Sequence, residues 1–279
     1  MSQTITPELR AWIVQQAQAG CTPQSVLAAM RRAGWDEDVA LTAMEEVLQA
    51  HLATLPMTTS LPRPHLALDG GPRALDAGDR VVQVIATLRR PRLAVLANVL
   101  SHEECEALIA LAAPRLQRSR TVQTSTGGEE LNPDRTSDGM FFRRGETPLI
   151  ERIEARLSRL LHWPVEHGEG LQVLRYRAGA QYKPHYDYFD PQAAGTARLT
   201  ARGGQRVATV VIYLNEPERG GGTTFPDVGL EVLPQRGSAV FFAYDQPDPA
   251  TLTLHGGAPV LEGEKWVATK WLRERPFTP

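Results

Sequence analysis

Residues 206–217 read RVATVVIYLNEP, an apolar run of β-branched and aromatic residues that stops at Asn, Glu and Pro. This composition is typical of a buried strand followed by a turn. Similar short runs, separated by Gly and Pro, read LQVLRYRAG (171–179), GLEVLP (229–234), SAVFFAY (238–244), TLTLHGG (251–257) and KWVATKWLRE (265–274). Such a succession of short strands predicts a double-sheet jelly roll, or double-stranded β-helix, with helices packed on the outside.

The residues before these strands have helical patterns. Ser101 followed three residues later by Glu104 predicts a capped amphipathic helix, and a second helix is expected over 148–161. Three further helical segments lie between Thr6 and His51. We therefore expect an α+β protein with a helical module at 1–55, a Pro- and Gly-rich linker at 56–80 and a jelly-roll catalytic domain at 81–279.

Composition restricts the partners and the location of this chain. It has 279 residues, 42% of them hydrophobic and 22% charged, with a net charge of −2. Nothing in this balance favours nucleic acid or an anionic membrane. The first residues lack a signal-peptide pattern and no apolar run is long enough to span a bilayer, so a cytoplasmic location is expected. Two cysteines exclude a disulfide framework and a thiolate metal site.

A candidate metal-binding pair occurs in residues 181–190, which read QYKPHYDYFD. His185 and Asp187 are separated by one tyrosine, and in an extended strand residues two apart point to the same face. Their polar heads would therefore converge, as metal ligands must. A His-x-Asp triplet also arises by chance, so this pair is significant only if the fold supplies a third ligand.

His255 is the candidate third ligand, because the other histidines lie in the helical module, the linker or near helix ends. Two histidines and one carboxylate form the facial triad of non-haem Fe(II) oxygenases, with zinc as the alternative metal. Lys265 follows ten residues later among apolar and aromatic residues. It favours iron, since a lysine buried there needs an anionic partner such as an acidic cosubstrate. A lysine that points to solvent is the alternative.

Several segments together resemble the prolyl 4-hydroxylase branch of the 2-oxoglutarate and Fe(II)-dependent dioxygenases. They are QYKPHYDYFDP, GGQRVATVVIYLNEPERGGGTTFP, PQRGSAVFFAY and HGGAPVLEGEKWVATKWLRER, with VLSHEECEALIALA and RTSDGMFF upstream. The resemblance covers about residues 90–275 and does not extend to the first 80 residues. It implies a jelly-roll enzyme that uses Fe(II), 2-oxoglutarate and O2, with ascorbate as a further expected cofactor.

The resemblance assigns a role to each matching residue. His185, Asp187 and His255 would be the catalytic iron ligands. The residues expected to bind 2-oxoglutarate are Lys265, which would pair with its distal carboxylate, and Tyr176 and Thr223. The residues expected to contact substrate are Tyr182, Arg206 and Trp271, with the two aromatic rings beside a prolyl ring and the arginine on the peptide backbone. The loop from Val122 to Ser137 is expected to act as a lid.

The expected reaction is hydroxylation of a prolyl residue in a peptide or protein, with release of succinate and CO2. Hydroxylation of a free amino acid or another small molecule by the same site is the alternative within catalysis. An adaptor protein that acts through the N-terminal helices is the alternative of a different class. A homodimer is a further expectation.

Overall fold

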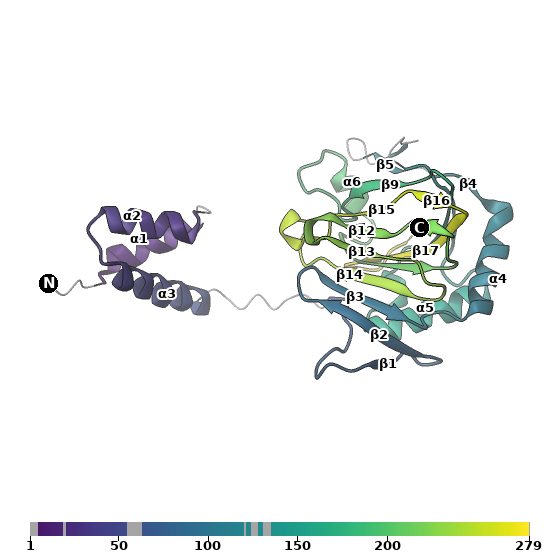
Figure 1. Ribbon diagram of the computed structural model, residues 1–279, viewed down its shortest axis with the longest axis horizontal. Helices are drawn as coiled ribbons and strands as arrows, with labels where there is room; N and C mark the ends of the chain where they lie inside the picture. The colour runs from purple at the N-terminus through teal and green to yellow at the C-terminus, as the bar shows by residue number, and fades with distance from the viewer. Residues whose placement is uncertain are drawn as a thin grey trace. The chain divides into compact units, whose positions relative to one another are not determined.

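The computed structural model of the chain describes residues 5–18, 21–54, 63–119, 121–123, 128–130 and 135–278. The chain divides into two units, Met1–Pro62 and Arg63–Pro279. Helices make up the first unit, and the strands belong to the second (Figure 1). The three helices of the first unit and the mixed strands and helices of the second fit the predicted α+β fold class.

The smaller unit contains α1 (Pro7–Gln18), α2 (Pro23–Arg32) and α3 (Glu37–Thr54). The side chain of Thr22 accepts a hydrogen bond from the backbone N–H of Ser25 and so caps α2, which has proline in its first turn. The apolar faces of the helices meet in a core of Ile13, Val26, Met30, Ala40, Ala43, Met44 and Val47.

Two antiparallel sheets form the larger unit. The nine-stranded sheet has the order β1 (Ala74–Asp76), β2 (Val81–Leu88), β3 (Arg92–Ala97), β14 (Ala239–Ala243), β10 (Arg206–Tyr213), β17 (Glu264–Arg273), β8 (Leu171–Arg177), β7 (Asp138–Phe142) and β4 (Gln117–Arg118). The four-stranded sheet has the order β13 (Leu230–Val232), β12 (Thr223–Phe225), β15 (His255–Gly257) and β9 (Tyr182–His185). Two short pairs, β5 (Thr121–Gln123) with β6 (Gly128–Glu130) and β11 (Arg219–Gly220) with β16 (Val260–Glu262), complete the strands.

Side chains on β10 alternate between two apolar cores, as strand geometry requires. Val210 and Ile212 pack with residues of α4 (His102–Ala112) and α5 (Pro148–Leu161) on the outer face. Figure 1 shows these two helices side by side next to the strands. Tyr213 points the other way, into a core shared with the small sheet, where the rings of Phe225 and Phe242 are 5.2 Å apart. The two facing sheets are the layers of the predicted jelly roll, and the site lies between them.

The helix starts agree with the sequence. Ser101 accepts from the backbone N–H of Glu104, whose carboxylate accepts in return from the backbone N–H of Ser101, so the predicted capping box is present. The second predicted helix corresponds to α5, which Thr147 caps. One more helix, α6 (Thr196–Thr200), lies between β9 and β10. The chain also forms 3-10 turns at Ala113–Arg115 after α4, at Val165–His167 after α5, and at Pro226–Val228 and Pro249–Thr251 between strands.

The predicted linker at 56–80 differs from the division seen in the structure. Residues 63–80 belong to the larger unit, where β1 pairs with β2 and Leu75 is buried. Asp79 also forms an ion pair of 2.6 Å with buried Arg156 of α5. Pairing and burial therefore fix this part of the chain, although its Pro and Gly content is typical of a linker. Residues 56–62 lie outside the described residues.

The strand predicted through residues 181–190 is shorter than expected. β9 ends at His185, which pairs with His255, the first residue of β15. Strand pairing between β9 and β15 stops at this pair, and Asp187 lies on a bend two residues after the end of β9. The bend, rather than a shared strand face, brings this carboxylate to the histidines.

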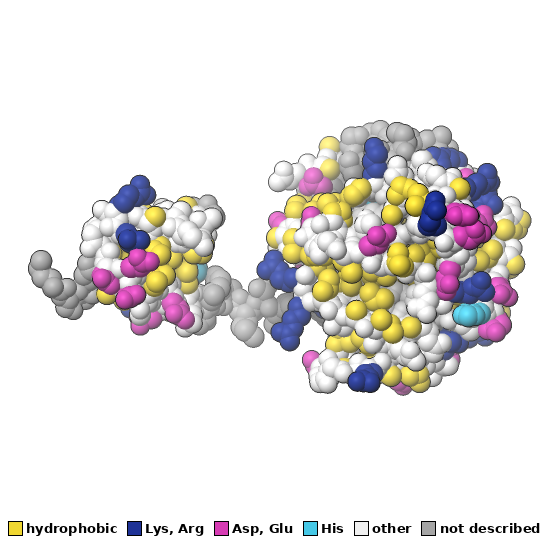
Figure 2. Space-filling view, in the orientation of Figure 1, with side chains coloured by type: hydrophobic (Ala, Val, Ile, Leu, Met, Phe, Trp, Pro, Cys, Tyr) yellow, Lys and Arg dark blue, Asp and Glu magenta, His cyan; other side chains and the backbone are white. Residues whose placement is uncertain are grey.

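Much of the predicted lid, Val122–Ser137, lies outside the described residues, namely 124–127 and 131–134. Its described backbone includes the β5–β6 pair, and Arg135 forms a β-bridge with Tyr182. In the described part of the chain no helix is long and apolar enough to cross a membrane. Figure 2 shows acidic and basic side chains interspersed on the visible face of the larger unit.

Candidate metal centre

His185, Asp187 and His255 come together between the two sheets. Each residue offers a ligand atom, and these atoms all lie within 4.8 Å of one another. The antiparallel pairing of β9 with β15 places the two histidines directly opposite each other. All three residues line one cavity, in which Asp187 and His255 are buried and His185 is partly exposed.

Backbone carbonyl groups orient both imidazole rings. Nδ1 of His185 lies 2.9 Å from the carbonyl oxygen of Lys183, and Nδ1 of His255 lies 3.0 Å from that of Thr253. Because a carbonyl can only accept, each Nδ1 carries a proton, so in the neutral ring it is Nε2 that offers the lone pair. The two Nε2 atoms lie 3.6 and 3.4 Å from the carboxylate oxygens of Asp187. Three lone-pair donors therefore face one point.

A hydroxyl pair holds the Asp187 carboxylate. The Thr209 hydroxyl donates to Oδ2 of Asp187 at 2.7 Å, and the Tyr244 hydroxyl lies 3.1 Å from Thr209 Oγ1. Since the hydrogen of Thr209 is used on Asp187, Tyr244 must donate to Thr209. Burial raises the pKa of Asp187, but the contacts with His255 and His185 and the charge of Arg206 outweigh burial and hold this pKa well below its ordinary value. The carboxylate is therefore ionised.

The donor set fits Fe(II). Burial lowers the pKa of His255 to about 4, partly offset by Asp187, so this imidazole is neutral at physiological pH and able to coordinate. Two imidazoles and one carboxylate on one side of a metal leave the remaining positions for other ligands, which is the facial-triad arrangement. The backbone and hydroxyl contacts fix the orientation of each donor, as outer partners of metal ligands do.

Lys265 lies in the same cavity and does not point to solvent. Its side chain is 4% exposed, and its ammonium group lies 5.7 Å from the ring centroids of both Tyr176 and Tyr213. Among the described residues no carboxylate is within ion-pair distance of it. Burial lowers the pKa of Lys265 to about 8, and the charge of Glu231 offsets this only in part. The site therefore has a desolvated cation available for an acidic ligand.

Thr223 and Tyr176 line the cavity together with Lys265. The Tyr213 hydroxyl donates to Thr223 Oγ1 at 2.8 Å, which leaves the hydrogen of Thr223 able to donate to a ligand. Tyr176 is paired directly opposite Lys265 in the β8–β17 ladder. The structure thus brings all three residues predicted for 2-oxoglutarate to one end of the cavity, and their ligand remains a prediction.

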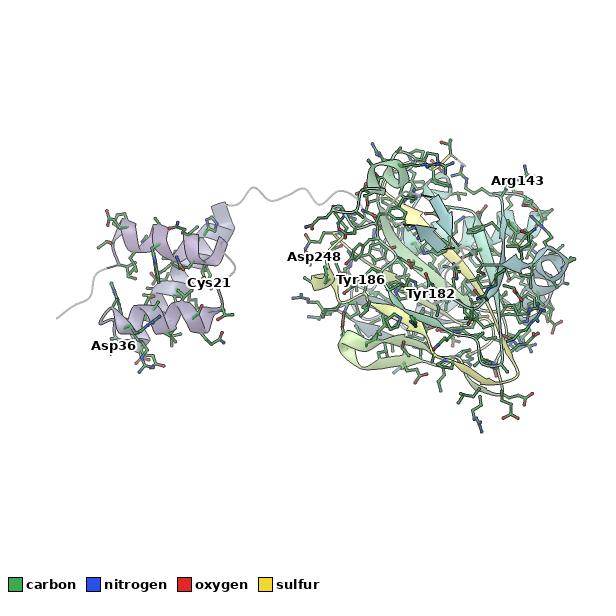
Figure 3. The ribbon with its side chains drawn as sticks, turned by 90° about the horizontal axis from the view of Figure 1, so that it is seen from above. Cys21, Asp36, Arg143, Tyr182, Tyr186 and Asp248 are labelled. Atoms are coloured by element: carbon green, nitrogen blue, oxygen red, sulfur yellow. The ribbon has the colours of Figure 1, made fainter. Side chains whose placement is uncertain are left out.

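Tyr182 and Trp271 also line the cavity. The Tyr182 ring stacks on His185 with centroids 3.7 Å apart, and Figure 3 shows Tyr182 within the strands of the larger unit. Trp271 lies on the same face of β17 as Lys265, as their even spacing predicts. Both aromatic residues thus lie in the same cavity as the metal-binding triad, and their predicted contact with substrate stays a prediction.

The contacts of Arg206 differ from those expected. Its guanidinium donates to both carboxylate oxygens of Glu169, at 2.7 and 3.0 Å, and lies 4.1 Å from the ring centroid of Trp271. A third contact, of 3.4 Å, reaches the backbone oxygen of Asp187. Arg206 thus supports Trp271 and the metal ligand from behind, and its predicted contact with a peptide backbone stays a prediction.

Sequence reasoning missed several supporting residues, which are Arg135, Glu169, Gln172, Thr209, Tyr213 and Tyr244. Arg135 lines the cavity, donates to Gln172 at 2.9 Å and lies 4.9 Å from the ring centroid of Tyr182. A signal existed for Thr209, since a hydroxyl residue an even number of positions before Tyr213 in an apolar strand shares its face.

Comparison with known proteins agrees with this geometry. Residues 171–273 match the model of the 2OG-Fe(II) oxygenase superfamily. Prolyl 4-hydroxylase 5 of Arabidopsis thaliana is 42% identical over 221 residues, which is 72% of this chain and 74% of that protein. Prolyl 4-hydroxylase 1 of the same plant is 45% identical over 204 residues, covering 66% and 70% of the two chains. The chain belongs to the prolyl 4-hydroxylase family of 2OG-Fe(II) oxygenases.

A solved member of this group has the same architecture. The viral collagen prolyl hydroxylase of Paramecium Bursaria Chlorella virus-1, in complex with 2-oxoglutarate, is 30% identical and covers 65% of this chain and 95% of its own, with a TM-score of 0.50. The predicted family, fold and enzyme class are confirmed. A prolyl 4-hydroxylase-type enzyme needs Fe(II), 2-oxoglutarate and O2, which favours iron over zinc at the His-Asp-His triad.

Proposed function

We propose that this enzyme hydroxylates a prolyl residue in a peptide or protein, consuming O2 and 2-oxoglutarate and releasing succinate and CO2. The observation that carries the proposal is one cavity lined by the His185, Asp187 and His255 donors and by buried Lys265. A metal-binding triad next to a desolvated cation suits a cosubstrate that chelates a metal at one end and has a carboxylate at the other. The relatives named prolyl 4-hydroxylases support the choice of proline.

The chain would hold the cosubstrate at two points. His185, Asp187 and His255 would hold the iron, and the keto-acid end of 2-oxoglutarate would lie next to these three residues. Lys265 and the Thr223 hydroxyl would bind the distal carboxylate, and a charge-assisted contact in this buried region is stronger than in water. These two contacts would position the reacting end of 2-oxoglutarate, and no protein side chain would need to react with it.

The same cavity would also position the target residue. Tyr182 and Trp271 offer two aromatic rings, and the ring of proline is already rigid before it binds, so little conformational freedom is lost. Arg206 and Glu169 hold the Trp271 ring in place. When bound, the iron with 2-oxoglutarate and O2 supplies the oxidising chemistry that replaces one C–H hydrogen by a hydroxyl group.

The test is an anaerobic titration with Fe(II) and 2-oxoglutarate, followed by exposure to O2 with proline-containing peptides. Mass spectrometry should find one added oxygen on proline for each succinate formed. Preferred turnover of free L-proline or of another small molecule would replace the peptide proposal by the small-molecule alternative. Stimulation by ascorbate, a homodimer and a cytoplasmic location are predictions that the same preparation and cell fractionation can test.

A further inference from the structure

A second aromatic ring lies beside Trp271 on the inner face of the nine-stranded sheet. In β7, Met140 and Phe142 pack into the outer core with α4 and α5. Phe141, between them, therefore points to the opposite face, the one that lines the cavity. Its ring centroid lies 6.3 Å from that of Trp271, with the planes tilted by 36°.

Phe141 is unusual for its exposure. Its side chain is 49% exposed, whereas Trp271 is 8% exposed. In the described part of the chain it is the one aromatic ring among the exposed large hydrophobic residues, which are otherwise aliphatic. Phe141 is not itself part of the cavity lining, but its ring lies next to Trp271, which is, so it extends the apolar surface outward from the edge of the cavity.

The carbonyl oxygen of Phe141 is already hydrogen-bonded. β7 pairs with β8 along one side, β4 pairs with Asp138 and Gly139 on the other, and Arg115 donates a hydrogen bond of 3.3 Å to the carbonyl oxygen of Phe141. A further strand would therefore have to displace Arg115 to use this acceptor. The face of the Phe141 ring is exposed, so a substrate would contact Phe141 through one of its side chains.

We propose that Phe141 forms a specificity subsite for an apolar side chain located two residues from the target proline. This inference rests on the proposed function, since Trp271 is taken as the ring beside the target residue. Phe141 would contact the neighbouring side chain on the same face of an extended substrate. The preferred substrates are then peptides with an aliphatic or prolyl residue either two residues before or two residues after the target proline.

The ring spacing selects this position. An extended strand rises about 3.3 Å per residue, so side chains two residues apart share a face and are separated by about 6.6 Å. In a polyproline II helix, with three residues per turn and a rise of about 3.1 Å, side chains on one face are three residues and about 9.3 Å apart. The distance of 6.3 Å between the two ring centroids matches the first geometry.

A peptide series tests the subsite. Each peptide contains one proline in an otherwise alanine-based sequence, and each flanking position from three before to three after it carries either leucine or glycine. We expect kcat/KM to be about 5- to 10-fold higher for leucine than for glycine at one position two residues from the target, as an aromatic contact of this kind gives. The preference should disappear in Phe141→Ala and persist in Phe141→Trp.

Ile85→Ala is the matched control, because Ile85 is 59% exposed on β2 and has no part in the cavity. It should keep the wild-type preference. A preference found only three residues from the target, no preference at all, or a preference that survives Phe141→Ala would each overturn the subsite while leaving prolyl hydroxylation intact. If no prolyl peptide gains oxygen, the proposed function fails, and the subsite fails with it.

Discussion

Replacing Lys265 by methionine should weaken 2-oxoglutarate binding and stabilise the ligand-free protein. Methionine keeps much of the apolar stem and removes the charge. Loss of the partner of a desolvated carboxylate costs on the order of 2–5 kcal/mol, which corresponds to an increase in Kd of roughly 30-fold to several thousandfold. Calorimetric titration under anaerobic conditions measures this change directly.

The stability gain follows from the pKa of the lysine. Its ordinary value is 10.5 and burial lowers it to about 8, so the charged form in the folded state costs about 3 kcal/mol at neutral pH. Without 2-oxoglutarate, Lys265→Met should therefore raise Tm by a few degrees.

This gain should depend on pH in a defined direction. Because the pKa of the folded state is the lower one, the penalty is fully present below about pH 8, decreases as the folded lysine loses its proton, and is absent above 10.5. The difference in stability between the variant and the wild type should follow the same course. Scanning calorimetry of both proteins between pH 7 and pH 10 measures this difference across the range in which the folded lysine titrates.

Lys270→Met is the matched control. Lys270 is also buried on β17, but it faces the outer side and forms an ion pair of 2.5 Å with buried Glu154. Its removal leaves that carboxylate unpaired, so Tm should fall and the affinity for 2-oxoglutarate should change little. An unchanged Kd for 2-oxoglutarate in Lys265→Met, or a fall in its Tm, would refute the reasoning.

Three further predictions concern the metal, the cosubstrate and the domain organisation. Thr209→Val should weaken metal binding by about 10- to 100-fold, measured by Co(II) titration, whereas Thr209→Ser should stay near wild type; equal affinity in both variants would contradict the role of this hydroxyl. In the wild type, the KM for 2-oxoglutarate should rise above about pH 8 as Lys265 loses its proton, with Glu231, Tyr176 and Tyr213 as the other titratable groups around it; a flat profile up to pH 9.5 would contradict this. A chain that begins at Arg63 should fold and bind iron with the affinity of the full chain, as a metal analysis of the purified protein can check.

The amino-acid sequence by itself determined the features that local rules encode. Strand and helix patterns, the Ser101 capping box and the limits of α5 depend on neighbouring residues, and the structure agrees with them. The sequence also proposed His185, Asp187 and His255 as metal ligands and Lys265 as a cation near them, and the structure brings these four residues into one cavity. The predicted reason was only partly right, because Asp187 reaches the histidines by a bend after β9 and not by a shared strand face.

Only the tertiary structure decided which distant residues support those groups. Thr209 reaches Asp187, Tyr213 reaches Thr223 and Glu169 reaches Arg206 because the register of neighbouring strands places them side by side. No local rule specifies that register, since it depends on the packing of the whole sheet. Tertiary contacts also determine where the larger unit begins. Burial and pairing of residues 63–80 come from contacts with β2 and α5, which their own composition does not encode.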